Sequence, residues 1–109
     1  MLGIAKLQRD LFKVEAMILQ GRLIMAMEIL ATAELEARED GQSEILSQIV
    51  MMRSGVLVQQ GKTLQALDVI AEFKSSDYYA QITVESRLRM IEFIRILNAE
   101  GYIESVQMA

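Results

Sequence analysis

The stretch Met17–Leu30, MILQGRLIMAMEIL, returns forty residues later as Leu57–Ile70, LVQQGKTLQALDVI. A third and weaker copy, LNAEGYIESVQMA, begins at Leu97. A fixed period of this size is typical of stacked supersecondary units, and the apolar residues on either side of each copy's glycine recur at helical spacing. The sequence therefore predicts helical hairpins that turn at three evenly spaced glycines: Gly21, Gly61 and Gly101.

The second copy contains Gly61-Lys62-Thr63, which matches the last three letters of a nucleotide-binding P-loop. That motif needs four residues between its first glycine and the Gly-Lys pair, and a buried strand ahead of it. Here five residues separate Gly55 from Gly61, and the segment ahead of them has helical periodicity. We therefore interpret Gly61 as the corner between two helices.

The periodicity and the complete absence of proline predict an all-α fold of about five to six helices. Gly41, which follows an acidic run, is expected to end a helix, and Ser43 or Asp77 to cap the helices that follow. With 109 residues, the chain is expected to form a single domain, residues 1–109, with units at about 1–40, 41–76 and 77–109. The expected helices lie near residues 4–20, 22–38, 43–60, 63–74, 78–99 and 102–109.

The composition removes several kinds of chemical site. The chain has neither cysteine nor histidine, so it lacks thiol chemistry, disulfides and the commonest ligands of zinc, copper and haem. It has no DxDxDG-type loop for calcium, and no base is placed to activate a serine. We therefore expect no catalytic residue, no cofactor and no metal site, and predict that the protein is not an enzyme.

The charge balance argues against nucleic-acid binding. Eleven basic residues against fifteen acidic ones give a net charge of −4, whereas nucleic-acid binding needs a dense basic face. Glu85 and Glu92 are interleaved with the nearby arginines in a pattern that indicates ion pairing, for example with Arg89 four residues after Glu85. The most apolar region, residues 14–35, is interrupted by charged residues, which argues against a membrane span. Without a signal-peptide pattern at the start, we expect a cytoplasmic protein.

The repeats resemble tetratricopeptide (TPR) units, which are antiparallel helical hairpins stacked into a right-handed superhelix. That family has a glycine at the corner, a small residue five positions later, and a small or apolar residue seven positions after that. Ser54 matches the family's small residue midway along the first helix, whereas Val14 departs from it. The period of forty departs from the family's usual ~34, and the aromatic anchors and closing proline are missing. The matching corner positions are Gly21, Ala26 and Ala33, then Gly61, Ala66 and Phe73, and finally Gly101 with Val106.

The resemblance implies a groove that is lined by the first helix of each hairpin and binds a peptide or helix of another protein. Most of the residues carried over by position are apolar, which suits an amphipathic helix docked through anchors three and four residues apart. The groove-facing residues are Leu11, Glu15 and Ile18, then Gln48, Met51, Gly55 and Val58, and finally Leu88, Ile91, Arg95 and Asn98. Ordinary core packing is the alternative for four of them: Leu11, Ile18, Met51 and Ile91.

The expected helix over residues 43–60 is apolar at nine positions, nearly all the way round. One hairpin cannot bury such a cylinder, so we expect surplus apolar surface that recruits a partner and gives a hetero- or homo-oligomer. The sequence thus predicts a non-enzymatic protein–protein interaction module, an adaptor or chaperone that binds an amphipathic helical segment. By size, repeat type and charge, the closest analogy is a bacterial type III secretion chaperone. The alternative is a structural homo-oligomeric subunit, or a fragment of a longer helical solenoid.

Overall fold

The computed structural model describes the backbone of residues 2–108 and the side chains of residues 3–99. The described backbone is helical along most of its length and contains no strand. The predicted all-α fold of five to six helices is confirmed. The helices are α1 (Leu2–Leu19), α2 (Leu23–Glu39), α3 (Ser43–Gln59), α4 (Thr63–Lys74), α5 (Asp77–Gln81) and α6 (Val84–Met108).

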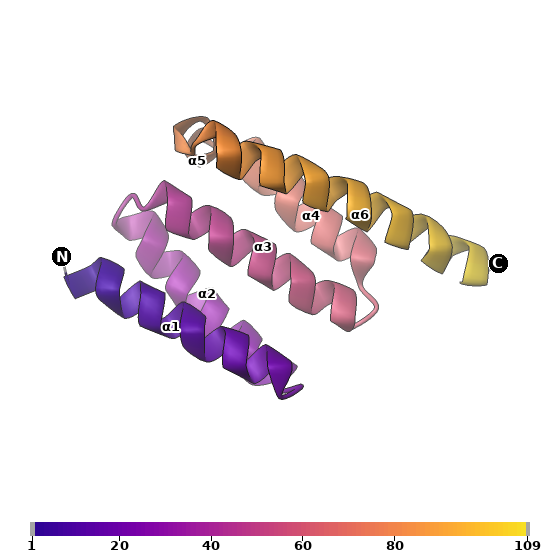
Figure 1. The fold of residues 1–109 in the computed structure, drawn as a ribbon, viewed down its shortest axis with the longest axis horizontal. Helices are drawn as coiled ribbons and strands as arrows, with labels where there is room; N and C mark the ends of the chain where they lie inside the picture. Colours follow the sequence, from indigo (N-terminus) through magenta and orange to yellow (C-terminus); the bar gives the residue numbers. More distant parts are fainter. Residues whose placement is uncertain (1, 109) are drawn as a thin grey trace.

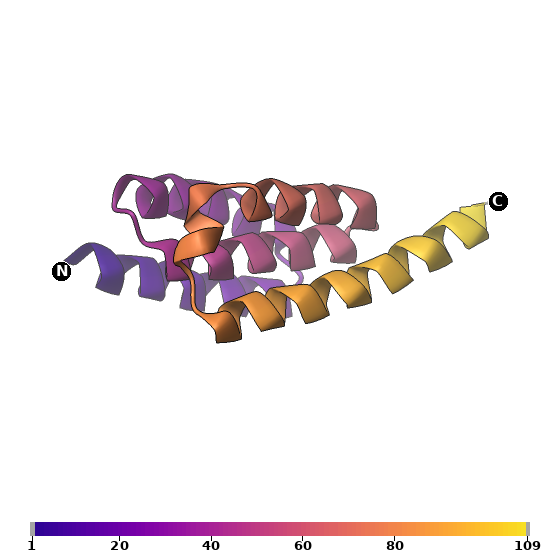
Figure 2. The ribbon, with the colours of Figure 1, turned by 90° about the horizontal axis from the view of Figure 1, so that it is seen from above.

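The helices form two layers. α1, α3 and α6 lie in one layer, and α2 and α4 lie in the other (Figures 1 and 2). α1 packs antiparallel against α2, and α3 against α4, while α2 also packs against α3. The short α5 carries the chain back from the second layer to the first, where α6 begins. The shortest dimension of the molecule, 19 Å, is the thickness of two helices packed about 8–10 Å apart.

Three corners share one backbone geometry. Gly21, Gly41 and Gly61 have φ angles of 75°, 65° and 74°, a region that glycine adopts without steric cost. At the first corner the Gly21 N–H donates to the Ile18 carbonyl (3.0 Å), and the next N–H, that of Arg22, donates to the carbonyl five residues back (2.8 Å). The same pair of bonds recurs at the other two corners, which makes each one a Schellman motif. Gly41 therefore ends α2 as predicted, and the corners are spaced twenty residues apart, one per helix.

Gly101 does not form a corner, because α6 runs through it from Val84 to Met108. The predicted division into helices over residues 78–99 and 102–109 is therefore wrong. A glycine in a helix interior costs only about 0.5–1 kcal/mol relative to alanine, so a long helix tolerates one. What makes Gly21 a corner is the Schellman hydrogen bonding around it, and the chain does not turn at residue 101.

The chain breaks instead between α5 and α6. Ile82 is extended (φ −83°, ψ 162°), and the Thr83 hydroxyl accepts a hydrogen bond from the Ser86 N–H at 3.1 Å, as an N-cap residue does. The predicted caps are also wrong: Gln42 and Ser76 hold the cap positions of α3 and α5, without side-chain cap bonds. Ser43 and Asp77 are the first residues of their helices.

α3 is the central helix and contributes to both hydrophobic clusters. The first cluster joins α3 to α1 and α2, and the second joins α3 to α4, Ile82 and α6. Met90 and Leu97 of α6 pack in the same cluster as Val50 and Leu57 of α3, which lie forty residues earlier. α6 thereby closes the core of the second hairpin. The buried residues of α3 are Ser43, Ile45, Leu46, Ser47, Ile49, Val50, Ser54, Val56 and Leu57.

The apolar surplus expected on residues 43–60 is therefore mostly covered by the chain's own helices, contrary to the prediction. The prediction assumes a helix that is covered by only one partner helix, as in a single hairpin. In the fold it is surrounded by helices of both hairpins and by α6. Met51, Met52 and Val58 are the half-buried large apolar residues that remain on it.

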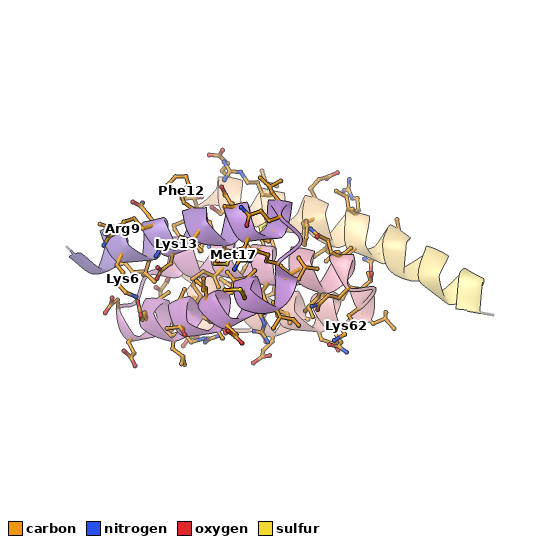
Figure 3. The ribbon with its side chains drawn as sticks, turned by 90° about the horizontal axis from the view of Figure 1, so that it is seen from below. Lys6, Arg9, Phe12, Lys13, Met17 and Lys62 are labelled. Carbon is orange, nitrogen blue, oxygen red and sulfur yellow. The ribbon has the colours of Figure 1, made fainter. Side chains whose placement is uncertain are left out.

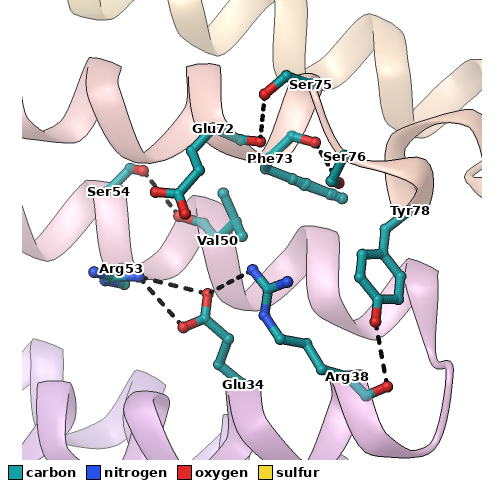
Figure 4. A network of polar contacts seen from close by, with 10 residues as sticks. All are labelled: Glu34, Arg38, Val50, Arg53, Ser54, Glu72, Phe73, Ser75, Ser76 and Tyr78. Atoms are coloured by element: carbon teal, nitrogen blue, oxygen red, sulfur yellow. Dashed lines mark hydrogen bonds and ion pairs between the residues drawn. The ribbon is translucent and has the colours of Figure 1, made fainter.

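A polar network ties α2 to α3 and α5 (Figure 4). The Glu34 carboxylate lies 3.3 Å from the guanidinium of Arg53 on α3 and 3.8 Å from that of Arg38 on its own helix. The Tyr78 hydroxyl donates to the Arg38 carbonyl (3.3 Å), and the Arg38 guanidinium lies 5.5 Å from the centre of the Tyr78 ring. These partly exposed contacts link α2 to α3 through Glu34 and to α5 through Arg38.

Candidate partner-binding face

A shallow depression of about 290 Å³ lies where α1 and α3 meet. Three of the residues predicted to contact a partner line it together: Leu11, Glu15 and Gln48. Leu11 belongs to the first hydrophobic cluster and is only 6% exposed, so it forms the floor, while Glu15 and Gln48 are exposed. We use the term partner face for this depression together with the exposed row of Leu88 and Ile91 on α6.

The other predicted residues of the first two hairpins are less accessible. Ile18 on α1 is half-buried and packs against the first cluster. On α3, Met51, Gly55 and Val58 are half-buried, and Met51 and Val58 pack against the second cluster. Only a part of each of these four residues is therefore accessible to a partner, and the rest is packed against the chain's own helices.

The predicted residues on α6 are exposed. Leu88 is 60% exposed, Ile91 is 41% exposed, and Arg95 and Asn98 are also exposed. Val84 continues the same row four residues before Leu88, because residues four and seven apart share one side of a helix. Ile91 is therefore partly packed against the chain and partly open to solvent, so core packing accounts for only a part of its surface.

The α6 residues do not share the depression on α1 and α3. Asn98 lines a separate depression of about 490 Å³ between α4 and α6, with Leu67 and Ile94 among its walls. Arg95 lies 3.4 Å from Glu92 on its own helix, an exposed pair that contributes little to stability. Of the eleven predicted residues, three therefore line the hollow on α1 and α3, four are half-buried on these two helices outside it, and four form a row on α6.

Two residues that line the α1–α3 depression were missing from the prediction. They are Gln8 and Phe12, and Phe12 is 70% exposed (Figure 3). Leu11 corresponds to Met51 forty residues later, and that register passes over the neighbouring Phe12. A usable signal exists: Gln8, Phe12 and Glu15 are spaced four and three residues apart, so they lie along one side of a helix.

The pKa values of two side chains, Lys6 and Glu44, are shifted from their ordinary values, and both side chains make contacts between helices. The Lys6 ammonium lies 2.8 Å from Glu36 on α2 and 3.2 Å from Asp10, and its hydrogen bonds to these carboxylates raise the pKa of Lys6. The hydroxyl of Ser86 and the backbone N–H of Thr83 donate to the Glu44 carboxylate, which lowers the pKa of Glu44. Neither group lines the α1–α3 depression.

The described residues include no group of three or more acidic side chains arranged to hold a metal ion. In the same part of the chain, none of the helices combines the length and the apolar content that crossing a membrane requires. Comparisons with protein-family models, with curated proteins and with solved structures found no match to this chain. The resemblance to tetratricopeptide units therefore rests on the sequence positions given above.

Proposed function

We propose that this chain is a non-enzymatic interaction module, an adaptor or chaperone, that holds an amphipathic helical segment of another protein on the partner face. The observation that carries the proposal is the α1–α3 depression with the exposed ring of Phe12 at its side. A shallow hollow with an apolar floor and polar edges suits one turn of an amphipathic helix. Leu88 and Ile91 supply a second row of apolar contacts on α6.

The energetics favour Phe12 as the principal anchor. Fully burying a phenylalanine side chain contributes about 1.5–3 kcal/mol, and aromatic residues dominate the binding energy of most interfaces. Gln8, Glu15 and Gln48 at the edge add hydrogen-bonding groups that orient a bound helix. A partner contact of this kind needs no catalytic group.

The test is site-specific photocrosslinking in cells of the native host. A photoreactive phenylalanine analogue is placed at position 12 in one variant, at Leu88 in a second and at Ile24 in a third. Ile24 is the matched control, since it lies on α2 in the other layer and is 73% exposed. We expect positions 12 and 88 to crosslink one protein through an amphipathic helical segment of it, and position 24 to give no such product.

Phe12→Glu should reduce recovery of that protein at least about tenfold, as expected for loss of a hot-spot aromatic residue. Ile24→Glu should leave recovery unchanged. Crosslinks that are equally frequent at position 24, or a captured segment with no apolar face, would contradict the proposal. A product that contains only a second copy of this chain would favour the structural homo-oligomer instead.

A further inference from the structure

The outer side of the first hairpin carries opposite charges on its two helices. This side, which we call the end face, is formed by α1 and α2 on the side away from the second hairpin (Figure 3). α1 contributes Lys6 and Lys13, with Arg9 beside them and the acidic Asp10 paired with Lys6, and α2 contributes Glu28 and Glu36. Lys6 and Glu36 already form an ion pair along the seam between the two helices.

Lys13 and Glu28 are two of the charges near this face that remain unused within the described residues, as does Arg9. Neither the Lys13 ammonium nor the Glu28 carboxylate forms an ion pair or side-chain hydrogen bond with any residue that the structure describes, and both side chains are exposed. Glu28 also lines a depression of about 320 Å³ at the seam, whose other walls are Asp10 and its ion-pair partner Lys6, with Ile29 and Thr32. This hollow offers an acidic wall to a cation from outside.

The two unused charges lie at nearly the same height along the hairpin. The Lys6–Glu36 contact of 2.8 Å shows which residues of the antiparallel helices are level. Each step along α1 is matched by one step back along α2, since both helices rise ~1.5 Å per residue. Lys13, seven residues after Lys6, is therefore level with Ile29, immediately next to Glu28.

From this charge pattern we infer that the end face binds a second copy of the chain, about a two-fold axis that runs along the α1–α2 seam. That rotation lays α1 of each copy over α2 of the other and preserves height along the helices. It brings each Lys13 to the Glu28-lined depression of the other copy, twice per dimer. In such an isologous interface the basic helix meets the acidic helix at both ends, so the face is complementary to itself.

The half-buried Ile29 and Met17 supply apolar contact between the charged positions. This interface is distinct from the partner face, because Phe12, Gln48 and Leu88 do not contribute to it. Dimerisation and helix binding are therefore independent, and failure of one does not entail failure of the other.

The test uses charge reversal and mixing, with mass measured by sedimentation equilibrium across a wide range of concentration. The unmodified chain should dimerise, and more weakly as salt rises, because the contacts are charged and exposed. Lys13→Glu alone and Glu28→Lys alone should each weaken the homodimer at least about tenfold, since like charges then meet twice. Mixing the two variants should restore dimerisation, because every position 13 then faces an opposite charge at position 28.

Matched controls come from the second hairpin. Asp68 is exposed on α4, forty residues after Glu28, and Lys62 is exposed at the α3–α4 corner. Asp68→Lys and Lys62→Glu should leave the dimer unchanged, and Phe12→Glu should leave it unchanged as well. Circular dichroism confirms that each exposed substitution leaves the helices intact.

Three results would overturn the inference. The first is a monomer at every concentration reached, and the second is a dimer that both charge reversals leave intact. The third is a mixture of Lys13→Glu and Glu28→Lys that dimerises no better than either variant alone.

Discussion

The Ser86 hydroxyl on α6 donates a hydrogen bond of 2.6 Å to the carboxylate of Glu44 on α3, forty-two residues earlier in the chain. The same carboxylate accepts the backbone N–H of Thr83. A negative charge thus lies at the N-terminus of α6, where the helix dipole and the free N–H groups favour it. The contact joins the beginning of the central helix to the beginning of the last one.

This contact predicts that the fold loses stability in acid through protonation of Glu44. Because the pKa of Glu44 is lowered in the folded chain, ionised Glu44 stabilises the fold above the ordinary carboxyl value of 4.5. That stabilisation is lost as the pH falls through the lower folded-state pKa. Glu44→Gln should cost about 1 kcal/mol at neutral pH, the difference between charged and neutral hydrogen bonds, and the cost should shrink below pH 4.5.

Urea unfolding at a series of pH values measures this effect. Glu39→Gln is the matched control, since Glu39 is exposed and takes no part in the contact. Equal pH dependence in Glu44→Gln and the unmodified chain would show that the carboxylate does not cap α6.

Replacing glycine by alanine should change the stability of the fold in opposite directions at a left-handed corner and inside a helix. Gly41→Ala should destabilise the fold by about 1 kcal/mol, because alanine is strained at a φ of 65° even though open space surrounds the position. Gly55→Ala should stabilise it by about 0.5–1 kcal/mol, because Gly55 is inside α3 and an added Cβ meets no atom within 4 Å. Thermal and urea unfolding measure both, and a loss of stability at Gly55 would contradict this account.

Because α3 and α4 approach closely at Ala66, we expect a larger side chain at this position to destabilise the fold. Ala66 is fully buried, and its carbonyl lies 3.4 Å from the hydroxyl of the buried Ser54. Ala66→Leu should cost about 1–3 kcal/mol through overpacking. Ala71→Leu on the exposed side of the same helix should change stability by no more than about 0.5 kcal/mol.

Two neighbouring residues test whether α6 closes the second core. Met90 is fully buried in that cluster, whereas Ile91 is 41% exposed. Met90→Ala should cost about 2–5 kcal/mol, and Ile91→Ala well under half as much. The comparison is made by denaturant unfolding, and similar losses at the two positions would mean that α6 is packed differently.

The local sequence determined the first four helices and their corners. Gly21, Gly41 and Gly61 each stand between two segments of helical periodicity, so a left-handed glycine can end one helix before the next begins. The pairing of Ser54 with Ala66 was also predictable, since small residues lie where two helices approach closely. On the partner face, the sequence register identified Leu11, Glu15 and Gln48, which share a depression, but missed Phe12.

Only the tertiary structure decided the rest. Gly101 follows a pattern similar to that before Gly21, yet α6 continues through it without the Schellman hydrogen bonds that turn the chain at Gly21. The apolar surface of α3 was visible in the sequence, but its burial required two hairpins and α6 to surround it. Helix ends follow from backbone hydrogen bonds within a few residues, whereas burial depends on contacts between residues tens of positions apart, which local periodicity does not encode.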